Sequence, residues 1–238
     1  MTILAVYILS LFLSGVAYAN VSLGPIPATL YPYQSSIALQ DDFLSGASSS
    51  GTLGTLGWFV VGTTTTLSEA ANPGIVRKDT SAVISTVSAL LLSGAQSNIN
   101  YQTNRSMTWI ARLNTNDANT TIRIGESNGC TVSPVTSGFY FEKLDADTNW
   151  FAVTRNAGTQ TRTDTTIAVT TTFMTFGLRV SGNGSTVSFS INNVLLLSQS
   201  TNIFPGLTSP CMQIVNSAAA AKTFDVDYFE LNMTGLSR

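Results

Sequence analysis

The chain has 238 residues, its net charge is −2, and only 10% of its residues are charged. It contains no histidine, which excludes Ser-His-Asp and Cys-His nucleophile pairs and His-ligated metal sites. Lys and Arg are too sparse for a nucleic-acid-binding surface. The apolar fraction of 44%, with 33 Thr and 28 Ser, indicates a folded β-type protein, and this length is typical of a single all-β domain.

Residues 1–19 are predicted to be a signal peptide or a retained apolar N-terminal segment. Residues 2–19 carry no charge, and the apolar run ends in Ala17-Tyr18-Ala19, a small-x-small pattern suited to signal peptidase. The run is shorter than the roughly 20 apolar residues of a membrane span. A signal peptide predicts an extracellular or cell-surface location, whereas a retained segment predicts packing in an assembly or a membrane anchor.

Residues 20–40 are predicted to be a Pro-containing leader or linker, with Pro25, Pro27 and Pro32 and few other structural signals. Residues 41–238 are predicted to be the folded domain.

Short strands with turn residues between them follow the leader, and no segment shows a sustained helical period. Apolar and polar residues alternate, as in strands with one buried face. Strands are predicted at 58–61, 74–77, 83–92, 107–113, 121–125, 138–142, 150–155, 176–180, 187–191, 194–197, 212–215 and 224–228. Asn192-Asn193 suits a two-residue turn, because Asn tolerates the left-handed conformation. The pattern predicts an all-β fold, a two-sheet antiparallel β-sandwich of the jelly-roll type.

Several short motifs occur in a characteristic order. They are Asp41-Asp42-Phe43-Leu44-Ser45-Gly46, Leu56-Gly57-Trp58, Asn72-Pro73-Gly74-Ile75, Arg123-Ile124-Gly125, Gly138-Phe139-Tyr140-Phe141-Glu142, Asn149-Trp150, Val153-Thr154-Arg155, Leu178-Arg179-Val180, Val187-Ser188-Phe189-Ser190-Ile191-Asn192 and Asp225-Val226-Asp227-Tyr228-Phe229. Over residues 41–232 this order resembles concanavalin A-like (laminin-G-like) jelly-roll domains in structural proteins of tailed bacteriophages.

The resemblance implies a non-enzymatic virion or surface structural protein of the fibre, decoration or receptor-binding type. Its implied location is a virion surface, and its implied partners are copies of itself or other virion or surface proteins. Related sandwiches occur in secreted proteins that bind glycans. The alternative is therefore an exported, lectin-like carbohydrate-binding module whose partner is a cell-surface glycan.

No catalytic residue is assigned, and the protein is expected not to be an enzyme. The candidates considered are Asp225, Asp227 and Glu230, whose Asp-x-Asp-x-x-Glu spacing resembles the signature of one jelly-roll glycoside hydrolase family. Asp225 and Asp227 share a strand face and could approach the carboxylate separation of a retaining hydrolase. Glu230 lies on the opposite face unless a bulge intervenes. In this pattern Phe224, Val226 and Tyr228 form the core face.

No cofactor is expected apart from a structural calcium ion. Asp41 and Asp42 open the first predicted strand, and Asp225 and Asp227 lie in the last. If those strands are neighbours, the four carboxylates could supply the oxygen ligands that Ca²⁺ prefers.

Two tryptophans are candidates for ligand binding. Trp58 and Trp150 follow turn-like residues, which favours a position near a sheet edge where an indole could stack on a sugar ring. The competing interpretation is packing between the sheets.

The two cysteines, Cys130 and Cys211, form a disulfide in an oxidising compartment or are two buried thiols in a reducing one. The sequence leaves both alternatives open.

Overall fold

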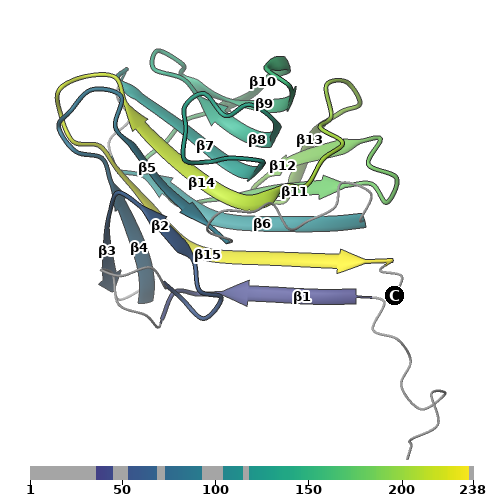
Figure 1. The fold of residues 1–238 in the computed structure, drawn as a ribbon, viewed down its shortest axis with the longest axis horizontal. Helices are drawn as coiled ribbons and strands as arrows, with labels where there is room; N and C mark the ends of the chain where they lie inside the picture. The colour runs from purple at the N-terminus through teal and green to yellow at the C-terminus, as the bar shows by residue number, and fades with distance from the viewer. Residues whose placement is uncertain (1–35, 45–52, 69–72, 93–103, 115–117, 236–238) are drawn as a thin grey trace, which may run out of the picture. The chain divides into compact units, whose positions relative to one another are not determined.

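The computed structural model describes residues 36–44, 53–68, 73–92, 104–114 and 118–235, which form fifteen strands (Figure 1). In chain order the strands are β1 (Ser36–Asp41), β2 (Phe59–Val61), β3 (Thr63–Ser68), β4 (Pro73–Asp79), β5 (Val87–Leu91), β6 (Asn104–Leu113), β7 (Thr120–Ser127), β8 (Gly138–Lys143), β9 (Asn149–Asn156), β10 (Thr159–Ala168), β11 (Met174–Val180), β12 (Val187–Ile191), β13 (Val194–Gln199), β14 (Ser209–Asn216) and β15 (Thr223–Thr234). Within these ranges no helix is long and apolar enough to cross a membrane.

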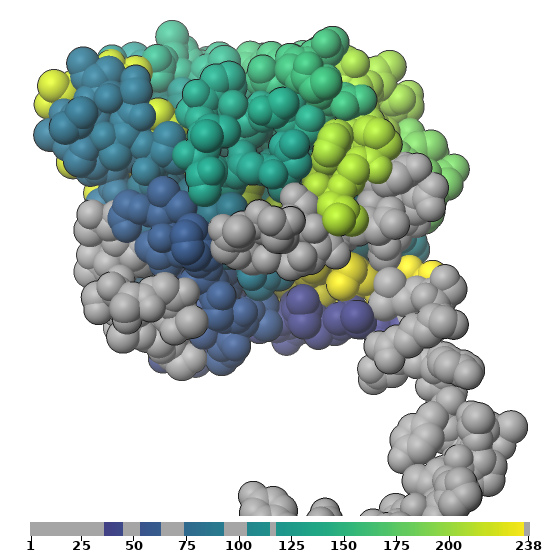
Figure 2. Space-filling model, in the orientation of Figure 1, coloured from purple at the N-terminus to yellow at the C-terminus, as the bar shows by residue number. Residues whose placement is uncertain are grey.

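The strands form two sheets, and all of their pairings are antiparallel. The first sheet has the order β13-β12-β11-β6-β15-β4-β3, with β1 also paired to β15. The second has the order β10-β9-β8-β7-β14-β5-β2. Figure 2 shows β15 and β1, in yellow and purple, side by side at one rim of the molecule. The predicted all-β, two-sheet antiparallel sandwich is confirmed.

The core lies between the sheets and is rich in aromatic rings. Trp58 packs against Trp109 and Phe229, with ring centroids 5.3 and 4.8 Å apart, and Trp150 packs against Phe176 at 4.8 Å. Such tilted and edge-to-face pairs are each worth about 0.5–1.5 kcal/mol beyond the burial of their surface. These contacts connect strands of both sheets.

A bulge divides β15 into two segments with opposite alternation. The register against β6 shifts between Val226 and Tyr228. Phe224 and Val226 face the core before the bulge, whereas Phe229 and Leu231 face it afterwards, all fully buried. The prediction that Tyr228 lies on the core face is therefore wrong. The extra residue at the bulge turns Tyr228 to the outer face, where it is half-buried.

Three strands, β1, β3 and β10, lie outside the strand ranges that the sequence predicted, and all three are edge strands. β1 ends at Asp41, where the sequence placed the opening of the first strand. β1 pairs along its length with the end of β15, from Ser36↔Thr234 to Asp41↔Phe229, so residues 36–40 of the predicted leader take part in the sandwich. The predicted segment 1–19 and the rest of the leader lie outside the described residues. The predicted Asn-Asn turn is confirmed, since Asn192 and Asn193 have φ values of 51° and 64°.

A buried lysine links the two sheets. Lys78 on β4 is fully buried, and its ammonium donates a hydrogen bond to the carbonyl of Val61 on β2 at 3.0 Å. Burial lowers the pKa of Lys78 from its ordinary 10.5 to about 7, against the opposing attraction of Asp79. At a pH above 7 the folded protein therefore holds fewer protons at Lys78 than the unfolded chain does.

Folding stability should therefore rise with pH between pH 7 and pH 9. A difference of one pKa unit corresponds to about 1.4 kcal/mol, so we expect a gain of about 2 kcal/mol over this interval. Urea denaturation across this pH range measures the gain. Lys78→Met should abolish it, whereas Lys222→Met, at a partly exposed position, should retain it. A wild-type stability that is constant with pH would contradict the prediction.

Candidate functional site

The two tryptophans that the sequence marked for ligand binding are buried in the core. Trp58 and Trp150 are 0% and 1% exposed. The Trp58 indole donates to the carboxylate of Asp41 at 3.0 Å and packs among rings of the first sheet. Neither ring can reach a sugar in solution, so the prediction of an edge position is corrected to packing between the sheets.

Asp225 is held in a closed ionic network on the outer side of β15. The fully buried carboxylate accepts hydrogen bonds from Arg77 at 2.7 and 2.9 Å, from Arg112 at 2.9 Å and from the Asn114 amide at 2.9 Å. Burial alone would raise the pKa of Asp225, but these donors outweigh it and hold the pKa below the ordinary value. Asp225 therefore acts as a structural anion.

The bulge brings Glu230 to the same outer face as Asp225. Glu230 accepts hydrogen bonds from the Asn232 amide at 2.6 Å and from the Tyr228 hydroxyl at 3.4 Å. Asp227 lies at the bulge itself. Asp225 and Glu230 thus accept hydrogen bonds from different sets of neighbouring donors.

The four aspartates proposed as calcium ligands do not converge. Asp41 accepts from the backbone of Phe43 and Leu56 and from the Trp58 indole, so both of its oxygens are used within the fold. Asp42 accepts from the backbone of Leu44. In register Asp41 lies opposite Phe229, four residues along β15 from Asp225. In the part of the chain that the structure describes, no three carboxylate, imidazole or thiol groups are placed to hold a metal ion.

The outer face of the second sheet is partly covered by the loop 128–137. A disulfide joins Cys130 of this loop to Cys211 of β14, with Cα atoms 6.3 Å apart. The Gln213 amide donates to the carbonyls of Cys130 and Val132 at 2.7 and 2.8 Å, and Val135 packs on the sheet. The loop is therefore anchored to the sheet by a covalent bond, hydrogen bonds and apolar contacts.

Charged side chains are buried on this covered face. Glu142 of β8 lies 3.7 Å from both the Arg123 and the Arg162 guanidinium, and Arg162 also pairs with Asp147. Burial raises the pKa of Glu142, against the lowering effect of the two arginines. Arg123 in turn donates to Ser133 of the loop. The charges of this face are matched to one another and to the loop.

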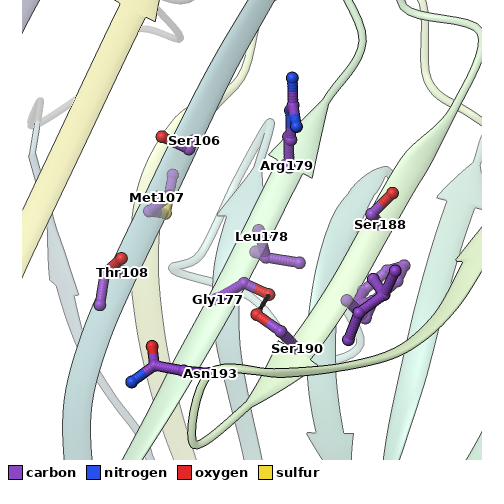
Figure 3. A pocket seen from close by; sticks show the side chains of 11 residues that line it. Ser106, Met107, Thr108, Gly177, Leu178, Arg179, Ser188, Ser190 and Asn193 are labelled. Atoms are coloured by element: carbon purple, nitrogen blue, oxygen red, sulfur yellow. Dashed lines mark hydrogen bonds between the residues drawn. The ribbon is translucent and has the colours of Figure 1, made fainter.

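The outer face of the first sheet, in contrast, carries a trough lined by short polar side chains. Cross-strand register places two rows of three residues across β6, β11 and β12. The rows are Ser106–Arg179–Ser188 and Thr108–Gly177–Ser190. We call the hollow lined by these six residues the Arg179 trough (Figure 3). It encloses about 350 Å³, and two adjoining hollows also have Arg179 in their walls.

Gly177 forms the floor of the trough. A Cβ atom at this position would lie 2.3 Å from the hydroxyl oxygen of Ser190. Figure 3 shows the Ser190 hydroxyl turned toward Gly177, whose carbonyl accepts its hydrogen bond at 3.4 Å. Leu195, 66% exposed at the start of β13, adds an apolar wall. The trough therefore combines hydroxyl donors and acceptors with one exposed apolar contact.

Sequence reasoning did not identify this site. The sequence pattern assigned no function to the Ser, Thr and Gly residues at the polar positions of its alternating strands. The available signal was the pair of short polar side chains in each of two predicted strands, Ser106 with Thr108 and Ser188 with Ser190. Only the strand order shows that these two strands flank the strand that carries Gly177 and Arg179.

Comparison with known proteins identifies the fold. No protein-family model and no curated protein sequence matches the chain. Solved structures do match. A protein of unknown function from Shewanella oneidensis MR-1 has a TM-score of 0.61 at 15% identity and covers 85% of this chain and 89% of its own. An endo-1,3-beta-glucanase from Streptomyces sioyaensis has a TM-score of 0.58 at 11% identity, over 87% of this chain and 99% of its own. Peanut lectin has a TM-score of 0.58 at 11% identity, over 85% and 99%.

The chain therefore has the concanavalin A-like jelly-roll fold shared by lectins and glucanases. At these identities the similarity establishes the fold and leaves the function to be argued from the residues of this chain.

Removing the Asp225 carboxylate should destabilise the fold at neutral pH. Asp225→Asn leaves Arg77 and Arg112 without their shared anion, and we expect a loss of about 3 kcal/mol. Because the folded-state pKa of Asp225 is lowered, this contribution is present above the ordinary value of 3.8 and is lost as the pH falls through the folded value. Urea titrations of wild type and variant should thus differ at neutral pH and converge in strong acid. Glu230→Gln is the control and should change stability little, and equal stability of Asp225→Asn and wild type at neutral pH would contradict the prediction.

Removing the disulfide should destabilise the protein strongly. The bond closes a loop with a sequence separation of 81. In the chain-entropy model such a closure is worth about 4.5 kcal/mol. The double variant Cys130→Ala/Cys211→Ala should therefore lose stability in urea denaturation, and reduction of the wild type should produce a loss of similar size. An unchanged denaturation midpoint after reduction would show that the cross-link contributes nothing.

Proposed function

We propose that this protein is a non-enzymatic glycan-binding protein and that the Arg179 trough is its binding site. The observation that carries the proposal is an open trough of suitable size in which four hydroxyl-bearing side chains lie beside apolar surface. Ligand sites in proteins are concave and combine apolar surface with a few placed polar groups. Serine and threonine hydroxyls both donate and accept, as sugar hydroxyls do.

The absence of an enzymatic role is inferred from the state of the carboxylates. Retaining hydrolysis requires two carboxyl groups about 5–5.5 Å apart on either side of the scissile bond, and an inverting reaction requires a wider pair. Asp225 is bound by two arginines, and Glu142 is buried between Arg123 and Arg162. The residues lining the trough include no acidic side chain. This arrangement supports binding without bond cleavage.

The fold is consistent with this role. Peanut lectin is a lectin by its name, and the carbohydrate recognition domain of Emp47p, with a TM-score of 0.57, is another similar structure. From these structures we take only the class of ligand, a carbohydrate. The residues proposed to bind it are identified from the strand pairing of this chain.

A glycan array tests the proposal. Wild-type protein is expected to bind a subset of glycans, and Gly177→Val, which fills the floor of the trough, should reduce that binding at least tenfold. Gly129→Val is the matched control, because Gly129 lies in the loop of the opposite sheet with open space around it, and its binding should equal wild type. The array is run with and without calcium, which also tests the expected calcium ion. Absence of binding in both conditions, or equal binding by Gly177→Val, would refute the proposal.

The non-enzymatic part has its own measurement. Incubation of the wild type with the glycans that it binds should release no new reducing ends. Release of reducing ends that persists after further purification would overturn this part of the proposal.

Display on a virion or cell surface is the setting that the resemblance to tailed-phage domains implies for such a binding protein. It stays a prediction of the sequence. Mass spectrometry of purified virions tests this prediction, because peptides from residues 36–235 should be found in them. Absence of these peptides from virions would favour an exported lectin-like module.

A further inference from the structure

Arg179 differs from every other described cation in its surroundings. Eight other Lys and Arg side chains in the described ranges have hydrogen-bond or ionic partners. They are Arg77, Lys78, Arg105, Arg112, Arg123, Lys143, Arg155 and Arg162. Lys222 also interacts with a neighbouring group. Among the described residues Arg179 has no such partner, and it is exposed on β11 at the meeting point of three hollows.

The neighbours of Arg179 leave its guanidinium accessible. Ser106 and Ser188 lie directly opposite it on the two adjacent strands. Directly opposed residues have Cβ atoms about 4.5–5.5 Å apart, so two hydroxyl groups flank the arginine within reach of a common ligand group. Figure 3 shows Arg179 between these two serines at one end of the trough.

No acidic side chain lines the hollows around Arg179. None of the described residues lining the three hollows is Asp or Glu. Glu230 continues the Thr108–Gly177–Ser190 row onto β15, one row away from that of Arg179, and it accepts hydrogen bonds from Tyr228 and Asn232. The trough therefore carries an uncompensated positive charge in a protein whose net charge is −2.

We propose that the Arg179 trough selects acidic glycans, with Arg179 pairing an anionic oxygen group of one sugar and the hydroxyls of Ser106 and Ser188 completing its contacts. The inference rests on the proposed glycan-binding function and adds the class of ligand. A guanidinium presents a planar fork of N–H donors that matches a carboxylate in bidentate geometry, and hydrogen bonds to an ionised group are roughly twice as strong as neutral ones. A sulfate ester offers the same anionic oxygens.

The test compares two copies of one glycan array that carries uronic-acid, sialylated, sulfated and neutral glycans. In the second copy the carboxylates are methyl-esterified, which removes their charge and preserves the sugar stereochemistry. Wild-type binding to carboxylate glycans should fall at least tenfold on esterification. A fall in binding on esterification shows that the anion is a carboxylate. If sulfated glycans bind equally on both copies and this binding depends on Arg179, the anion is a sulfate.

Variants assign the effect to the trough. Arg179→Gln should reduce binding to acidic glycans at least tenfold, and Arg179→Lys should give an intermediate affinity because it keeps the charge and loses the fork. Arg155→Gln removes the same charge from the opposite sheet and should bind as wild type does. Raising the salt concentration should weaken wild-type binding and leave Arg179→Gln unaffected.

The outcomes separate this inference from the proposed function. If glycans bind and Gly177→Val abolishes binding, but neither esterification, salt nor Arg179→Gln changes it, the trough binds neutral sugars and the inference is wrong. If no glycan of either copy binds, both the glycan-binding function and the inference fail.

Discussion

The bulge in β15 is the constraint on which the first sheet depends. β15 pairs with β6 along its length, with β4 at its start and with β1 at its end. One extra residue at the bulge lets Phe224 and Val226 face the core on one side and Phe229 and Leu231 on the other. Without it the alternation would turn one of these pairs of apolar residues into solvent.

The same bulge determines which polar residues line the outer face. Beyond it Glu230 and Asn232 face outward, opposite Thr108 and Ser106 of β6. Before it Asp225 faces outward and pairs with arginines of β4 and β6. The outer face of this sheet is thus divided into a region of strong ion pairs and a region of small hydroxyl groups. The Arg179 trough lies in the second region.

The two outer faces of the sandwich have different roles in this molecule. On the second sheet the loop 128–137 is fixed by the Cys130–Cys211 bond and lies over charged side chains that are matched to each other. Between the sheets, Arg105 and Glu126 form a further buried pair, with distances of 2.7–3.1 Å. Many of the few charged side chains are therefore paired with one another within the fold. Arg179, exposed on the first sheet, differs from them because it has no such partner among the described residues.

The sequence predicted the interior strands and the edge strands β2 and β13, but it did not give the ranges of the edge strands β1, β3 and β10, for a physical reason. Strands with a buried face, such as β6, β11 and β12, show strict alternation because one side must be apolar. β10 has six exposed residues out of ten and lacks that signal. The site was missed because large aromatic and acidic residues were expected to mark it. Trp58 and Trp150 pack in the core, whereas the trough is a hollow because the side chains that line it are short.

The ends of the sandwich meet at one place, because Ser36 pairs with Thr234 in the register of β1 and β15. Neighbouring strands are about 4.8 Å apart, so a short linker could join these two points and the chain could be opened elsewhere, for example at the Ala157-Gly158 turn between β9 and β10 of the second sheet. The same corner borders the Arg179 region, since Thr234 lines the hollow that also contains Asn104 and Arg179. A tag fused directly after Thr234 would consequently stand beside a hollow that shares Ser106 and Arg179 with the trough, whereas a circular permutant opened at a distant turn would leave that hollow clear.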